Sequence, residues 1–144
     1  MDYSSTFAVS AAGMALERTR VEVAALNLAN AHTTQGPGQA PYSPLQVVAQ
    51  ATASGSFGAL MGSDGLSRGA PEFHVEPANV APRIVHEPGH PLADAKGFVN
   101  YPGVDAATEM VSLMSATRAY EANVAAMNTA RTMALKALDI GGTT

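Results

Sequence analysis

The chain has 144 residues, of which 47% are apolar and only 14% charged, with a net charge of −4. Soluble domains usually contain about 25% charged residues, so we expect other protein to cover much of this surface. No run of Lys or Arg is present, which argues against nucleic acid as a partner. No stretch reaches the ~20 apolar residues of a membrane-spanning helix, so no direct membrane insertion is expected. The chain has no cysteine, which excludes disulfides.

The first segment, residues 4–31, has the periodicity of a long helix interrupted only by Gly13. One apolar stripe repeats every seven residues, and a second alternates spacings of three and four, as in a coiled-coil seam. An offset of two residues places the stripes roughly 200° apart around the helix. We assign residues 1–34 to an N-terminal helical arm. The first stripe comprises Phe7, Met14, Val21 and Leu28, and the second includes Leu16, Val23 and Leu26.

The last segment predicts a second long helix over residues 104–140, within a C-terminal helical arm at 104–144. Asp105 is a suitable N-cap, and the helix dipole stabilises the negative charge of Glu109 in the first turn. Gly141 and Gly142 supply a stop signal. An apolar stripe again alternates spacings of three and four, and it includes Met110, Leu113, Tyr120, Val124, Met127 and Leu138.

The middle of the chain, residues 35–103, contains all the prolines and predicts a β-containing insert. Its Gly-, Ser- and Ala-rich part at 51–71 reads as a long mobile loop. Short strands are expected at residues 45–50, 73–76, 83–86 and 97–101.

The expected fold class is therefore α+β, with long terminal helices in a coiled-coil-like pair and a small β insert between them. Pairing the two helices leaves one apolar face on each, which predicts packing against neighbouring chains. The alternative is a monomeric helical hairpin whose second faces cover the insert.

Asn27 and Asn30 lie three residues apart near the end of the first helix, where Asn is a poor helix former. Either the helix frays there, or the two amides tie the arm to the following turn or to a neighbouring subunit. We include both with the apolar stripe residues in the predicted subunit interface.

Residues 86–90 match the zinc-peptidase pattern H-E-x-x-H, with His86 and His90 as ligands and Glu87 as base. That chemistry requires a helix to place both histidines on one face. Pro88 and Gly89 oppose a helix and predict a turn. We therefore predict no catalytic, metal-binding or cofactor-binding residue and no enzymatic activity, with a small zinc metallopeptidase as the alternative of a different class.

Several motifs in chain order resemble those of a known family. Three of them resemble the N-terminal motifs of flagellar rod and hook proteins: SAAGM at 10–14, NLANAHTT at 27–34 and PY at 41–42. Four others resemble motifs of the FlgC type of rod protein: EPGHP at 87–91, GFVNYP at 97–102, TRAYEANV at 117–124 and ALKALDIG at 134–141.

The resemblance implies a structural subunit of the bacterial flagellar proximal rod, which transmits torque from the motor ring to the hook. It implies contacts with further copies, with rod proteins of the FlgB, FlgF and FlgG types, and with the FliE-type adaptor. It also implies passage through the flagellar type III export apparatus to the periplasm, without cofactors. Residues 1–5 show no secretory signal, which agrees with export without a cleaved signal peptide. A FlgB-type rod subunit is the alternative within the axial proteins, and the motif at 117–124 argues against it.

Overall fold

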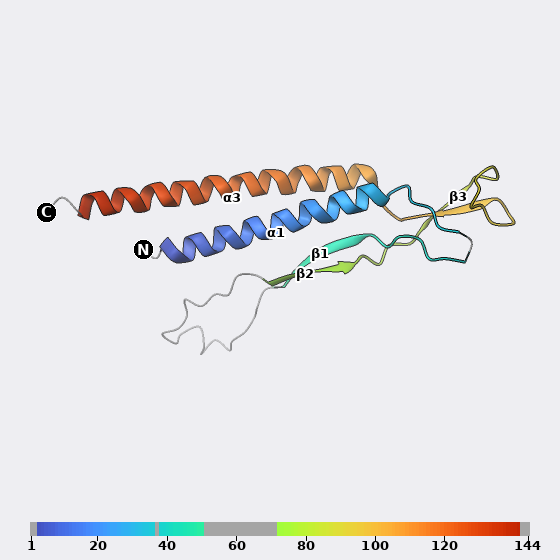
Figure 1. Ribbon diagram of the computed structural model, residues 1–144, viewed down its shortest axis with the longest axis horizontal. Helices are drawn as coiled ribbons and strands as arrows, with labels where there is room; N and C mark the ends of the chain where they lie inside the picture. The colour runs from blue at the N-terminus through green and yellow to red at the C-terminus, as the bar shows by residue number, and fades with distance from the viewer. Residues whose placement is uncertain (1–2, 37, 51–71, 142–144) are drawn as a thin grey trace, which may run out of the picture. The chain divides into compact units, whose positions relative to one another are not determined.

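The computed structural model describes residues 3–36, 38–50 and 72–141. A long helix stands at each end, α1 (Tyr3–Asn30) and α3 (Ala106–Gly141), and the strands lie between them in the sequence (Figure 1). The predicted α+β fold class is confirmed. The loop predicted at 51–71 lies outside the described residues. Neither described helix contains a stretch apolar enough to span a bilayer.

Helix α1 ends at Asn30, one residue before the predicted end. Its last carbonyls accept hydrogen bonds from nearby side chains and from the turn that follows, in place of helical N–H groups. The Asn30 side-chain amide donates to the Leu26 carbonyl at 2.8 Å. The Asn30 carbonyl accepts from the Thr33 backbone N–H at 3.1 Å and from the Thr33 hydroxyl at 2.6 Å. These bonds anchor the end of the helix to the turn that follows.

Helix α3 begins at Ala106 because Asp105 caps it, as predicted. The Asp105 carboxylate accepts from the backbone N–H of Ala107 at 3.3 Å and from the Thr108 hydroxyl at 2.5 Å. The Asp105 carbonyl accepts the first helical bond, from the N–H of Glu109 at 3.0 Å. The cap satisfies backbone donors that have no partner inside the helix.

The strands form two separate two-stranded sheets at the predicted positions. β1 (Leu45–Gln50) pairs with β2 (Glu72–Pro77), and β3 (Arg83–His86) pairs antiparallel with β4 (Phe98–Tyr101). In the second sheet Val85 lies opposite Val99. Because side chains alternate along a strand, Val85 and Val99 share the face that buries Val99, which is 1% exposed.

The turn between β3 and β4 is held by Asp94. Its carboxylate accepts from the backbone N–H groups of Lys96 and Phe98, each at 2.8 Å. These bonds, first that from Phe98, hold the pKa of Asp94 below its ordinary value. Gly97 follows with φ at 79°, a conformation that other residues rarely adopt. The side chain and the glycine together fix how the chain enters β4.

The described residues form two compact units, each containing part of both helices. One consists of the described parts of Met1–Arg18, Ala49–His74 and Ala116–Thr144, and the other of Thr19–Val48 with Val75–Ser115. In the first unit, a Cβ added to Gly13 of α1 would lie 2.9 Å from the Asn123 amide nitrogen of α3. A side chain at position 13 would therefore require the Asn123 amide of α3 to shift.

The buried core of the described chain is built mainly from small and polar side chains. Few large apolar side chains are buried, whereas many lie exposed along α3. The buried residues are Ser10, Glu17, Ala116 and Ala130 in the first unit, and Val23, Ala24, Asn27, Ala31, Pro44, Val99 and Pro102 in the second.

Gly103 precedes α3 at a point where no side chain fits. A Cβ there would lie 2.7 Å from Val80 Cγ1 and closer still to the Ala81 carbonyl oxygen. Gly103→Ala should destabilise the β3–β4 hairpin by about 1–3 kcal/mol, because backbone cannot move aside cheaply. Amide hydrogen exchange of the hairpin measures this change. Gly89→Ala is the matched control, since nothing lies within 4 Å of its added Cβ; equal protection in both variants would contradict the packing argument.

The Asp105 cap makes the start of α3 sensitive to acid. The Thr108 hydroxyl, followed by the Ala107 N–H, holds the pKa of Asp105 below its ordinary value of 3.8. A lowered folded-state pKa stabilises the helix start above the unfolded pKa, and this contribution is lost as pH falls through the folded pKa. NMR shifts of the Ala107 and Thr108 amides should therefore move towards coil values below about pH 4. Asp105→Asn should remove that transition, and its persistence would assign the acid response to another group.

Candidate functional site

The side chain of Asn27 connects three separate parts of the chain in the second unit. Its amide nitrogen donates to the Leu45 carbonyl at 2.8 Å and to Glu109 Oε1 at 3.0 Å. Its oxygen accepts from the Leu45 backbone N–H at 2.8 Å and from the Tyr42 hydroxyl at 2.9 Å. Only 1% of Asn27 is exposed. The end of α1, the segment entering β1 and the first turn of α3 are thus joined through one carboxamide.

All the hydrogen-bonding capacity of the Asn27 amide is used. A primary amide has two N–H donors and two acceptor lone pairs, and each has one partner here. We call Asn27, Tyr42, Leu45 and Glu109 the Asn27 network. Burial, and then the negative charge of Glu109, raise the pKa of Tyr42. The Tyr42 hydroxyl therefore remains protonated and can donate to Asn27 at neutral pH.

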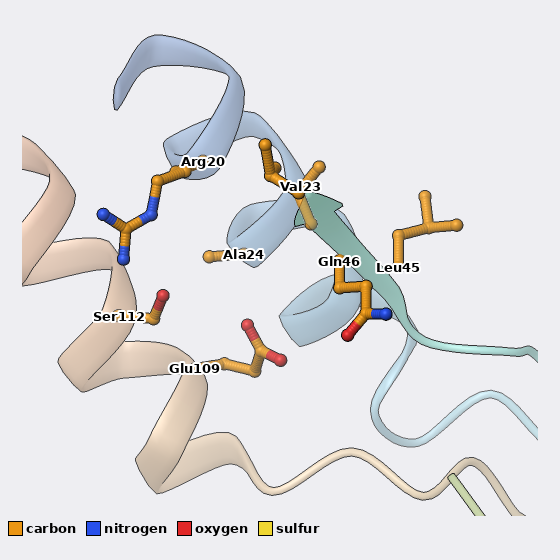
Figure 2. Close-up of a pocket in the computed structure, with 8 residues that line it drawn as sticks. Arg20, Val23, Ala24, Leu45, Gln46, Glu109 and Ser112 are labelled. Atoms are coloured by element: carbon orange, nitrogen blue, oxygen red, sulfur yellow. The ribbon is translucent and has the colours of Figure 1, made fainter. Parts of the chain in front are cut away.

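A cavity of about 230 Å³ opens beside the Asn27 network, between α1, β1 and α3 (Figure 2). Its walls combine apolar side chains of α1 and β1 with polar groups from all three elements. Figure 2 shows the Glu109 carboxylate between the two helices, with Ser112 and Gln46 on either side. The lining residues are Arg20, Val23, Ala24, Leu45, Gln46, Val47, Glu109 and Ser112.

In the H-E-x-x-H segment His86 ends β3 and the chain turns at Pro88 and Gly89, as predicted, so the two histidines do not share a helix. The His86 ring packs against Phe98 with centroids 5.0 Å apart. The His90 Nδ1 atom accepts from the Leu92 N–H at 3.1 Å, and Glu87 accepts from the Tyr101 hydroxyl at 2.9 Å. Across the part of the chain that the structure describes, no three His, Cys, Asp or Glu residues gather as metal ligands would.

The residues predicted to form a subunit interface differ in exposure. Val23 and Asn27 are buried within the chain, so their side chains already have internal contacts. Two groups remain accessible. The half-buried residues are Phe7, Met14, Leu16, Val21, Leu28, Asn30, Leu113, Val124 and Met127. The exposed residues are Leu26, Met110, Tyr120 and Leu138.

The two predicted asparagines have different surroundings. Asn30 bonds only within its own turn and with Thr33, whereas Asn27 bonds to distant segments. Sequence reasoning missed Tyr42, Leu45 and Glu109 as partners of Asn27. A detectable signal was present, because an Asn inside an otherwise apolar helix needs polar partners if it is buried.

Replacing Asn27 should strongly destabilise the second unit. Asn27→Ala leaves the Leu45 N–H and the Tyr42 hydroxyl without their partner, and each unsatisfied buried group costs about 1–3 kcal/mol. Asn30→Ala, on the same helix, removes hydrogen bonds that are exposed to solvent and should cost about 0.5–1.5 kcal/mol. Urea unfolding followed by tyrosine fluorescence measures both. A change no larger for Asn27→Ala than for Asn30→Ala would show that the network contributes little.

Comparison with known proteins finds relatives over nearly the whole chain. The protein named flagellar basal-body rod protein FlgC from Escherichia coli O6:H1 is 41% identical over 94% of this chain and 95% of its own length. The protein of the same name from Salmonella typhimurium is 40% identical over the same shares. That from Bacillus subtilis is 37% identical over 92% of this chain and 94% of its own length.

A family model described as the C-terminal region of the flagellar basal body rod FlgEFG proteins matches residues 95–140. This match covers β4 and nearly all of α3. Together with relatives that extend over both helices and the insert, it confirms the resemblance drawn from the motifs. The chain belongs to the FlgC family of flagellar basal-body rod proteins.

Proposed function

We propose that the chain is a structural subunit of the flagellar rod that carries torque through helix–helix packing with neighbouring subunits. The observation that carries this proposal is the set of large apolar side chains exposed to water along α3. A monomer with this surface would bind other protein or aggregate. The exposed residues include Met110, Val111, Met114, Leu135, Leu138 and Ile140.

The first turns of α3 have one buried side and one exposed apolar side, as a helix with contacts on two sides requires. Glu109 and Ser112 face the cavity, and Ala116, four residues after Ser112, is fully buried. Met110, Val111 and Met114 are more than half exposed. At 100° per residue these three lie within one arc of the helix, opposite the buried side. One side would pack within the chain and the other against a neighbour.

The Asn27 network suits a subunit under torsional load. The four hydrogen bonds of Asn27 hold the end of α1 to the start of α3 and to the segment that enters β1. These hydrogen bonds would have to break before α1 could slide past α3. Apolar contacts between subunits would then pass the load along the assembly without deforming the base of each helix.

We place the chain in the basal body, in the rod that crosses the periplasm, after export without a cleaved signal. Its partners would be further copies, rod subunits of the FlgB, FlgF and FlgG types, the FliE-type adaptor and the flagellar export apparatus. The role is structural rather than enzymatic. No contact of His86, Glu87 or His90 favours the zinc-peptidase alternative, because each has a role in the hairpin fold.

Polar substitutions at two exposed apolar positions of α3 test the proposal. Met110→Gln with Leu138→Gln should leave the fold of the isolated chain unchanged, because both side chains already lie in water. Each loses about 1.5–3 kcal/mol of burial in the assembly, so incorporation into the rod should fall by roughly tenfold or more. Immunoblots of purified basal bodies and swimming of a complemented deletion strain measure this.

Ser115→Gln is the matched control for these substitutions. Ser115 is exposed on the same helix and is already polar, so its replacement should assemble normally. Normal incorporation of the double variant would contradict an apolar subunit interface at these exposed positions of α3.

A further inference from the structure

His90 lies at the centre of the connection between β3 and β4. Its backbone N–H donates to the Glu87 carbonyl at 3.0 Å, and its carbonyl accepts from the Ala93 N–H at 3.0 Å. Its side chain closes the same turn, because Nδ1 accepts from the Leu92 backbone N–H at 3.1 Å. Within the described chain this nitrogen is the one acceptor for that N–H. The turn therefore depends on a side-chain acceptor as well as on backbone hydrogen bonds.

The sequence explains why a side chain takes this role. Pro91 follows His90 and has no backbone N–H, so Leu92 carries the first donor after the histidine. The His90 side chain reaches that donor across the proline, as Asn and Asp side chains reach the N–H two residues further on in other turns. The hydrogen bond is partly buried, so water replaces the acceptor only in part if it is lost.

The hydrogen bond requires His90 to be neutral. A backbone N–H only donates, so Nδ1 must present a lone pair and the ring proton must lie on Nε2. A second proton would turn Nδ1 into a donor that faces another donor. Histidine takes up that proton at about pH 6.5 in unfolded peptides. The hydrogen bond is therefore present above this range and is lost as the pH falls through it.

The charged groups of the hairpin do not offset this loss. The formal charges of residues 83–101 sum to zero, and the side chains that carry them are Arg83, Glu87, Asp94 and Lys96. Both carboxylates already accept hydrogen bonds, Glu87 from the Tyr101 hydroxyl and Asp94 from two backbone N–H groups. Arg83 lies over the Tyr101 ring, and the ring of His86 packs against Phe98. Among the described residues, none forms an ion pair with His90.

We propose that His90 is a pH-sensitive switch that holds the β3–β4 turn closed at neutral pH and releases it in mild acid. The released segment leads to Asp94, whose carboxylate holds the start of β4. Pairing of the strands, with Val85 opposite Val99, does not use this hydrogen bond, so the tip loosens while the strands stay paired. The hairpin thus responds to acid in a range where its carboxylates remain charged, well above the transition of the Asp105 cap. The proposal does not depend on the rod function.

His90→Asn in the full-length chain is the central test. Asn Oδ1 is bonded to Cγ as His Nδ1 is, and it accepts a hydrogen bond at every pH. In the wild-type chain, the protection of the Leu92 amide against exchange should fall by about threefold to tenfold between about pH 7.5 and 5.5, as expected for the loss of one hydrogen bond. In His90→Asn the protection should stay constant. NMR measures this exchange, with each rate corrected for the intrinsic rate at that pH.

Two matched controls carry the same substitution at other histidines. His86→Asn removes the other histidine of the hairpin, and His32→Asn removes one outside it. The Leu92 amide should keep its pH response in both variants. His90→Ala removes the acceptor altogether, so Leu92 should be poorly protected at both pH values.

Nitrogen-15 spectra of the His90 ring test the premise directly, because they show which ring nitrogen carries the proton. A proton on Nδ1 at neutral pH would overturn the proposal. A Leu92 response that persists in His90→Asn would assign the transition to another group, as would one that disappears from His86→Asn while Val99 keeps its strand shifts. If the wild-type chain shows no strand shifts for Val99 at neutral pH, no closed turn exists and the proposal falls.

Discussion

A single buried carboxamide, that of Asn27, determines how the second unit is organised. Its four hydrogen bonds reach Tyr42, both backbone groups of Leu45, and Glu109. A buried amide that loses a partner pays the full cost of desolvation, so none of these segments can move alone without leaving a donor or an acceptor unpaired. Because a hydrogen bond depends on angle as well as distance, the network fixes the register of the segments in a way that apolar contacts could not.

The small core has a direct consequence for the surface. Ala24, Ala31, Ala116 and Ala130 are buried, and Gly13 lies against Asn123, so the helices approach closely with little apolar volume between them. The larger apolar side chains are then available outside. This distribution would be costly for a protein that works alone, but it suits a subunit whose remaining apolar surface is buried on assembly.

Local features of the fold could be predicted from the sequence, and non-local ones could not. Asp105 acts as a cap through bonds within three residues, and Pro88 with Gly89 form a turn, so short-range chemistry decided both. Both long helices carry apolar residues on two sides, so periodicity could not tell which side faces inward. Asn27 was recognised as unusual, but its partners lie 18 and 82 residues away, and no local pattern reports such a pairing. Glu109 was expected only to be stabilised by the helix dipole, and the structure adds its hydrogen bond to Asn27.

The two sequence separations within the Asn27 network imply an order of folding. The bonds to Leu45 close a loop of 18 residues, and the bond to Glu109 spans 82. Loop-closure entropy makes the longer closure about 1.3 kcal/mol more costly. The α1–β1 corner should therefore form first, with its amide nitrogen still carrying one unused donor for Glu109. The end of α1 would then be a preformed template on which α3 nucleates, and pulse-labelling hydrogen exchange would observe it as early protection around Leu45.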